Sequence, residues 1–289
     1  KWDAANAAPG TIVFVIMFHG INKDPADVEP NGISDQDFDK LMKSLKELGF
    51  EAINTTQLAD FLEHNAKIPP RSVVLIQDDR HYAENFNTHF RPYWEKWGWP
   101  VVNAWISFED GIRNAVLPEN LALNAEGWVD YQSHGYIHNI PMSDSSTDEF
   151  LKGEFEGSIN DLQQNFHKTP VAIIWPGGGF GVRPVQFARQ YGYRLGFTIN
   201  PRGPLMYNWI PLADASDPQR PYFLAEGFVH DPLMTLPRYW PYQVLPNLDT
   251  IRVMGDEAAA YAQQSKAVEL EYYDIVCAPT YGAMPTVAP

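Results

Sequence analysis

Short runs of apolar residues recur along the chain and alternate with longer segments that are apolar only at every third or fourth position. Runs of this length that end in polar or glycine-rich turns are typical of strands buried on both faces. The predicted strands cover 11–18, 52–54, 73–76, 101–106, 128–132, 171–174 and 195–199. Because strands and helical segments keep alternating, the pattern predicts a mostly parallel sheet with helices outside it, either a barrel or a doubly wound sheet.

The helical segments are bounded by recognisable capping residues. Ser34 is the expected N-cap of a helix whose apolar positions recur over 38–48, and Gly49 ends that helix. Thr56 is expected to cap a second helix that runs to Leu62. Further helices are predicted at 86–97, 117–123, 148–166 and 185–191.

Side chains that can do chemistry collect where the predicted strands end. His19 ends the first strand, and Asp78 and Asp79 follow the third. His134 and His138 come directly after a later strand. In parallel α/β folds, ligands bind where the carboxyl ends of the strands gather. The five side chains are therefore expected to form one site.

The residue types in this group are those of a metal centre. Two neighbouring aspartates at a strand end point in different directions, so one can bind a metal while the other contacts a water molecule. His134 and His138 are four residues apart and can face one ion, and a carboxylate completes a two-histidine, one-aspartate set with open positions. The alternative is that Asp78 and Asp79 only form a polar turn. The other histidines are interpreted as surface or packing residues: His64, His81, His89, His167 and His230.

The charge of the chain limits the partners it can have. The 289 residues carry a formal net charge of -15, which argues against nucleic acid and against an anionic membrane surface. A neutral or cationic ligand fits better. The 9 Trp and 14 Tyr offer flat faces suited to sugars, although core packing accounts for most such rings. No run of about 18 apolar residues is present, so no transmembrane segment is expected.

Domain organisation is expected to be simple. A leader at 1–10, one domain at 11–270 and a tail at 271–289 are predicted. Cys277 is the only cysteine, which excludes an intrachain disulfide and an all-cysteine metal site. The expected location is secreted, periplasmic or cell-surface, with the cytoplasm left open. The oligomeric state is left open as well.

Several motifs resemble those of the polysaccharide deacetylase family, also called the NodB-homology or carbohydrate esterase family 4. Residues 76–80 correspond to its Thr-Phe-Asp-Asp-Gly motif and 133–138 to its Ser-His-x-x-x-His motif. Residues 176–178 are similar to its Pro-Tyr-Gly turn. Phe-His-Gly at 18–20 and Leu-Pro-Arg at 236–238 resemble the branch that includes poly-N-acetylglucosamine deacetylases. The resemblance spans most of the chain, roughly 11–240.

The resemblance implies a distorted (β/α) barrel of the NodB-homology type, with mostly parallel strands, outer helices and a site at its C-terminal face. It implies a hydrolase that removes acetyl groups from an acetylated glycan or amino sugar. Asp79, His134 and His138 would hold a divalent ion, by default zinc, with cobalt or nickel as alternatives. Asp78 would be the general base and His19 the acid. Five further residues would contact substrate: Arg80, Tyr136, Trp175, Pro176 and Gly177.

The chain also departs from the family pattern. Gln77 replaces a Phe, Arg80 replaces a Gly, and Ile174 and Trp175 stand where the third motif has an Arg. Arg80 beside two carboxylates is expected to lower their pKa values and to fill part of the groove, unless it points outward to a surface carboxylate. These departures leave two alternatives: a family member that binds glycan without turnover, and a metallo-hydrolase of the same fold that acts on a small-molecule amide or ester. The sequence does not separate N- from O-deacetylation.

Overall fold

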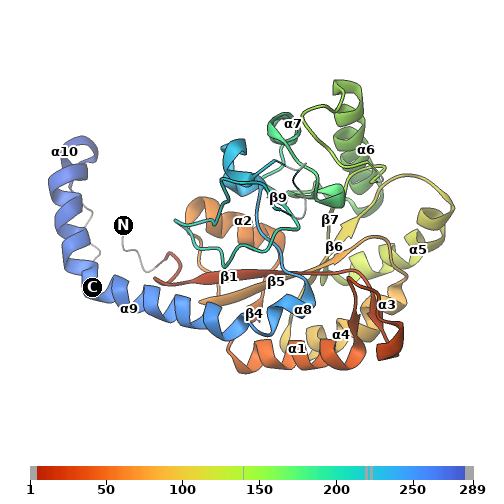
Figure 1. The fold of residues 1–289 in the computed structure, drawn as a ribbon, viewed down its shortest axis with the longest axis horizontal. Coiled ribbons are helices and arrows are strands. Elements are labelled where there is room, and N and C mark those ends of the chain that lie inside the picture. Colours follow the sequence, from red (N-terminus) through yellow and green to blue (C-terminus); the bar gives the residue numbers. More distant parts are fainter. Residues whose placement is uncertain (1–4, 139, 219–220, 222–223, 284–289) are drawn as a thin grey trace.

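The computed structural model describes residues 5–138, 140–218, 221 and 224–283. Parts of the predicted leader and tail, 1–4 and 284–289, lie outside the described residues. The residues predicted as tail are helical as far as Tyr281. There α9 (Leu248–Tyr272) continues through a π-helical turn, Tyr273–Cys277, into α10 (Ala278–Tyr281), and Figure 1 shows this helix leaving the body of the fold. None of the helices in the described ranges has the length and apolarity needed to span a membrane.

A parallel sheet forms the centre of the fold. Its strands, in spatial order, are β1 (Ile12–Phe18), β5 (Arg71–Asp78), β6 (Val101–Trp105), β7 (Val129–Ser133), β8 (Ala172–Ile174) and β9 (Leu195–Phe197). The short strand β4 (Glu51–Ala52) pairs with the start of β5, while β2 (Ile21–Asn22) and β3 (Ile33–Ser34) form a separate parallel pair. The sheet curls into a half-barrel (Figure 1), which confirms the distorted (β/α) barrel expected from the sequence.

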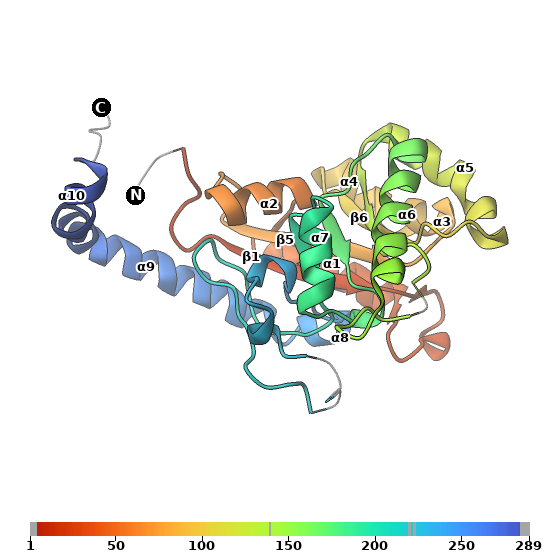
Figure 2. The same ribbon diagram turned by 90° about the horizontal axis from the view of Figure 1, so that it is seen from above.

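Helices surround this sheet, as Figures 1 and 2 show from two directions. They are α1 (Asp35–Glu47), α2 (Thr55–His64), α3 (Ala83–His89), α4 (Arg91–Trp97), α5 (Gly111–Glu126), α6 (Asp148–Phe166), α7 (Val182–Gln190) and α8 (Pro241–Val244), in addition to α9 and α10. Alternate residues of β1 pack against different helices. Phe14 lies in one buried cluster with Leu41 of α1, and Val13 lies in another with Leu58 of α2. Both faces of the strand are therefore covered, as its continuous apolar run predicts.

The gap between the edge strands β9 and β1 is spanned by an extended segment, residues 236–239. On one side the Leu236 N–H donates to the Gly196 carbonyl at 2.8 Å. On the other side the Tyr239 N–H donates to the Val15 carbonyl at 2.9 Å. Segment 236–239 thus links the two edges of the half-barrel by backbone hydrogen bonds.

Three predicted helix boundaries are wrong, each for a local reason. The predicted helix 86–97 is two helices, α3 and α4, that meet at Phe90, with a proline in the first turn of the second. The predicted helix 117–123 is the longer α5, which Asp110 caps by accepting the Arg113 N–H. Asn54, not Thr56, caps α2, because its side chain and that of Gln57 form a reciprocal capping box. The predicted N-cap Ser34 and helix end at Gly49 are confirmed.

Candidate metal centre and active site

Three side chains from the carboxyl ends of two strands converge on one point. Asp79 follows β5, and His134 and His138 follow β7. The Asp79 Oδ1 atom lies 3.8 Å from Nε2 of His134 and 3.6 Å from Nε2 of His138. All three potential ligand atoms are within 4.8 Å of one another. Two imidazole nitrogens and one carboxylate oxygen form a donor set suited to a divalent transition-metal ion, so these residues fit the group that the sequence implies.

The protonation state of the two histidines suits metal binding. Burial lowers the pKa of His134 to about 4, and burial followed by the charge of His134 lowers that of His138 to about 4. Both rings are therefore neutral near pH 7 and keep a free lone pair. The Nδ1 atom of His134 lies 2.7 Å from the Ile174 carbonyl oxygen, which sets the tautomer and leaves Nε2 facing the cluster.

Two of the three clustered residues have an unusual backbone. Asp79 has φ of 70° and His138 has φ of 72°, both in the left-handed region that residues other than glycine rarely adopt. Residues held in such conformations cost roughly 1–3 kcal/mol each and gather at functional sites. The surrounding structure must therefore hold both backbones in place.

Asp78 lies beside this cluster but is bound to different partners. Its carboxylate is 1% exposed and lies 2.6 and 2.9 Å from Nη1 of Arg238. The Nε2 atom of His19 is 3.6 Å from Oδ2 of Asp78. Burial alone would raise the pKa of Asp78, but the charges of Arg238, His134 and His19 outweigh it and hold the pKa below its usual value. Asp78 is therefore ionised at neutral pH.

Sequence reasoning missed the role of Arg238. This side chain is completely buried on segment 236–239, and its Nε donates to the Thr198 carbonyl at 2.8 Å. It supplies the cation beside Asp78, a place that neither Ile174 nor Trp175 can fill. The only sequence signal was the Leu-Pro-Arg match itself, because Arg238 and Asp78 are 160 residues apart.

Gln77, one of the departures, has a clear structural role. Its buried amide nitrogen donates to the carbonyls of Phe18 at 3.1 Å, His19 at 2.7 Å and Asp78 at 3.1 Å. The end of β1 is thereby tied to the end of β5, which holds His19 next to Asp78. His81 was interpreted from sequence as a surface or packing residue. Its Nε2 lies 2.9 Å from the Asp78 carbonyl oxygen, and burial lowers its pKa.

Arg80 does not lie against the two aspartates as the sequence suggested. Its Nη1 atom is 2.6 Å from Oδ1 of Asp110, the N-cap of α5, and its side chain is mostly buried in that pair. Arg238 rather than Arg80 lowers the pKa of Asp78. The prediction that Arg80 tunes the carboxylates is therefore corrected, because its guanidinium pairs with another acid.

The expected substrate contacts divide into buried and accessible residues. Trp175 is completely buried, and its indole N–H donates to the Met234 carbonyl at 2.8 Å. A buried ring presents no face to a glycan, so the structure gives Trp175 a packing role in place of the expected contact. Pro176 is also buried, whereas Gly177 is exposed and Tyr136 is partly exposed.

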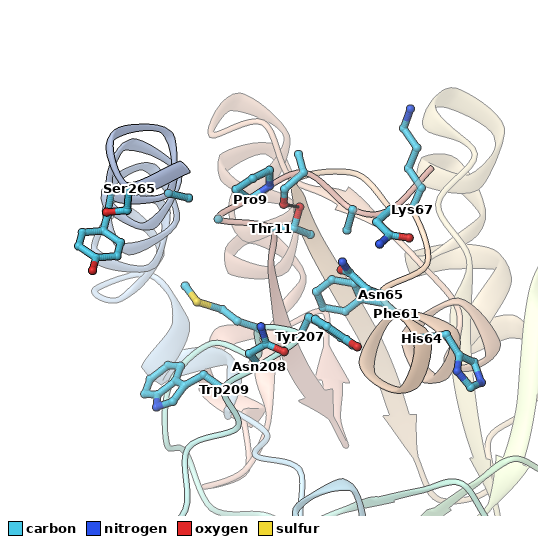
Figure 3. A pocket seen from close by; sticks show the side chains of 17 residues that line it. Pro9, Thr11, Phe61, His64, Asn65, Lys67, Tyr207, Asn208, Trp209 and Ser265 are labelled. Carbon is cyan, nitrogen blue, oxygen red and sulfur yellow. Dashed lines mark hydrogen bonds between the residues drawn. The ribbon is translucent and has the colours of Figure 1, made fainter. Parts of the chain in front are cut away.

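A groove in the structure lies away from this site. It has a volume of about 760 Å³ and is lined by residues that include Thr11, Phe61, Asn65 and Trp209 (Figure 3). Thr11 precedes β1, so the groove is at the amino end of that strand. His19 and the metal-ligand candidates lie at the carboxyl ends of the strands. The chemistry identified above therefore lies outside this groove.

Comparisons with known proteins agree with this geometry. Solved structures with similar folds include the Streptococcus pyogenes deacetylase PplD in complex with acetate, with a TM-score of 0.64 at 18% identity, covering 85% of this chain and 99% of that one. A de-N-acetylase from Aggregatibacter actinomycetemcomitans gives 0.63 at 17% identity, covering 83% and 99%. IcaB from Ammonifex degensii gives 0.62 at 15%, covering 85% and 99%. At these identities the likeness shows a shared fold.

A search of curated proteins gives no match. The model of the polysaccharide deacetylase family matches residues 68–196, a segment that includes Asp78, Asp79, His134 and His138. The resemblance drawn from the motifs is thus confirmed, and this segment of the chain is similar to the polysaccharide deacetylase family.

Proposed function

We propose that the protein is a metal-dependent deacetylase that hydrolyses acetyl groups on a polysaccharide or amino sugar. The observation that carries the proposal is the convergence of Asp79, His134 and His138 beside the buried pair of Asp78 and Arg238. The family match and the fold independently support deacetylase activity.

The donor set favours zinc, with cobalt or nickel as alternatives, because imidazole and carboxylate ligands suit these ions. Such an ion, when bound, polarises a carbonyl oxygen and lowers the pKa of a water molecule to about 7. The neutral state of both histidines favours binding, because no proton has to leave the rings first.

The roles of the protein's own groups follow from their positions. Asp78 is ionised and accepts the proton of the attacking water on a carboxylate oxygen, as a general base does. Arg238 orients that carboxylate and keeps it ionised. His19, with Nε2 3.6 Å from Asp78, donates a proton to the leaving nitrogen or oxygen of the sugar. Tyr136 and Gly177, at the rim, are the candidates for sugar contact.

Charge and location are consistent with this proposal. An acetylated amino sugar is neutral and its amine product is cationic, and both suit a chain with a net charge of -15. We also propose a secreted, periplasmic or cell-surface location, because a polymeric glycan outside the cell does not cross a membrane to reach a cytoplasmic enzyme.

The two alternatives differ in measurable ways. The chain is stripped with a chelator, reloaded separately with zinc, cobalt or nickel, and tested for acetate release from N-acetylated and O-acetylated glycans and from small acetamides and aryl acetates. We expect release from an acetylated glycan only in the metal-loaded protein, and none from Asp79→Ala. Glycan binding without acetate release under every metal would support the alternative that binds glycan without turnover. Acetate release from small molecules alone would support the alternative of a metallo-hydrolase that acts on a small-molecule amide or ester.

A further inference from the structure

A carboxylate on α6 lies directly beneath the loop that joins the two clustered histidines. Glu154 is 1% exposed although it is a glutamate on a helix. Its Oε2 accepts the Tyr136 N–H at 2.8 Å and its Oε1 accepts the Ile137 N–H at 2.9 Å. Two successive backbone donors therefore converge on one side chain.

The loop has little freedom apart from these bonds. Gly135 has φ of 74°, and a Cβ atom there would lie 2.6 Å from Oε2 of Glu154 and 2.8 Å from Cγ of Pro176. The backbone at Gly135 is thus closely packed between α6 and the turn after β8. His138 itself is in the left-handed region with φ of 72°. The carboxylate compensates this conformation by satisfying donors that the turn leaves without partners.

Helix stability does not explain a glutamate at this position. Burial of a charged carboxylate is costly, and an apolar residue at this buried position would cost less. Among the described residues Glu154 forms no ion pair with a Lys, Arg or His side chain, so the two loop N–H groups are the donors that offset the cost of burying its carboxylate. The role of the Glu154 side chain is therefore to bind the loop backbone.

We propose that Glu154 is a positioning residue that fixes His138 in the geometry required to bind the metal. It holds the N–H groups of Tyr136 and Ile137, the two residues before His138, and so it sets where the His138 imidazole points relative to Asp79 and His134. The inference rests on the metal-dependent function proposed above and assigns the residue that pre-organises its third ligand. Partners that orient metal ligands typically contribute about 10- to 100-fold to metal affinity.

Glu154→Gln tests this assignment in the full chain. The amide keeps the shape but places an NH₂ donor against an N–H donor, so at least one bond to the loop is lost. We expect the zinc dissociation constant, measured by competition with a chromophoric chelator, to rise about 10- to 100-fold. The matched control is Glu156→Gln, two residues along α6, whose partly exposed carboxylate contacts Tyr191 and not the loop. That control should bind zinc like the parent.

A double-mutant cycle separates positioning from general loosening. In a His138→Ala background, Glu154→Gln should no longer change the zinc dissociation constant, because the ligand through which it acts is gone. An undiminished effect in that background overturns the proposal, as does parent-like binding by a folded Glu154→Gln. A parent chain that binds no zinc, cobalt or nickel instead overturns the proposed function and the inference that rests on it.

A measurement on the unmutated protein covers the case in which Glu154→Gln does not fold. Amide hydrogen exchange of Tyr136 and Ile137 in the metal-free parent should be slow, because both N–H groups are bonded to Glu154. Exchange of these amides at the rate of an unprotected loop would overturn the proposal without any mutation.

Discussion

Nη1 of Arg238 lies 2.6 and 2.9 Å from the two carboxylate oxygens of Asp78, and both side chains are buried. The pair joins the end of β5 to segment 236–239. A buried carboxylate would by itself tend to stay protonated, and the guanidinium reverses that tendency. The proposed base is thus kept ionised by a residue from a distant part of the chain.

The first prediction concerns this pair. Arg238→Met should raise the pKa of Asp78, because burial remains and its largest opposing charge is removed. Since the base acts only when ionised, the acid limb of the plot of kcat/KM against pH should move to higher pH. Unfolding by urea should show a loss of about 3–5 kcal/mol, the cost of leaving a buried charge without its partner.

Arg194→Met is the matched control for that substitution, because Arg194 pairs with Glu63 and Asp60 near the surface and far from the site. Its pH profile should match the parent. An unchanged acid limb in a folded Arg238→Met would remove Arg238 from control of Asp78.

The second prediction distinguishes the two neighbouring aspartates. Asp79→Ala should raise the zinc dissociation constant at least about 100-fold, since a ligand is lost rather than an outer partner. Asp78→Asn should bind zinc within about threefold of the parent but lose about 10²- to 10⁴-fold in kcat, because an amide does not accept the proton of water. Isothermal titration and acetate release measure the two effects. Reversed behaviour of the two variants would mean that their roles are exchanged.

The third prediction concerns His19. Its replacement by Ala should leave zinc affinity unchanged, because its Nε2 faces Asp78 rather than the three clustered ligands. Turnover of acetamides should fall more than turnover of activated aryl acetates, since an amine leaves only after protonation. His64→Ala, at an exposed histidine, is the control. Equal losses on both substrates would argue against an acid role for His19.

The fourth prediction concerns Arg80. Arg80→Gly should keep the zinc affinity and the pH profile of the parent, because the guanidinium pairs with Asp110 and not with the site carboxylates. We expect a stability loss of about 1–2 kcal/mol from the lost ion pair and the added glycine flexibility. A changed glycan preference in this variant would restore the substrate role that the sequence suggested for Arg80.

The sequence predicted the parts of the site that depend only on local patterns along the chain. The strand ends that carry Asp79, His134 and His138 could be found because apolar runs mark buried strands and parallel strands end at a common edge. The carboxyl end of β1 brought His19 to the same place. These predictions needed only the order of the elements along the chain.

The remaining parts depend on contacts that no local pattern encodes. Arg238 is brought to Asp78 by a segment that follows a long irregular stretch. Glu154 lies on the buried face of α6, and the helical spacing of that face does not show which of its residues contacts the loop. Trp175 was placed at the substrate because the motif was matched by position, whereas its neighbours Phe155 and Met234 show that it belongs to the core. The direction in which Arg80 points depends on the position of α5, which its own strand does not determine.

The order of these residues along the chain has a consequence for folding. Residues Asp79, His134 and His138 are synthesised well before segment 236–239, which both bridges the edges of the sheet and carries Arg238. A growing chain therefore contains the three proposed metal ligands before it contains the counter-charge of Asp78. Because docking of a late, sequence-distant segment is a slow step in folding, we expect newly made protein to bind metal first and to become hydrolytically competent only when the last bridge between β9 and β1 has formed.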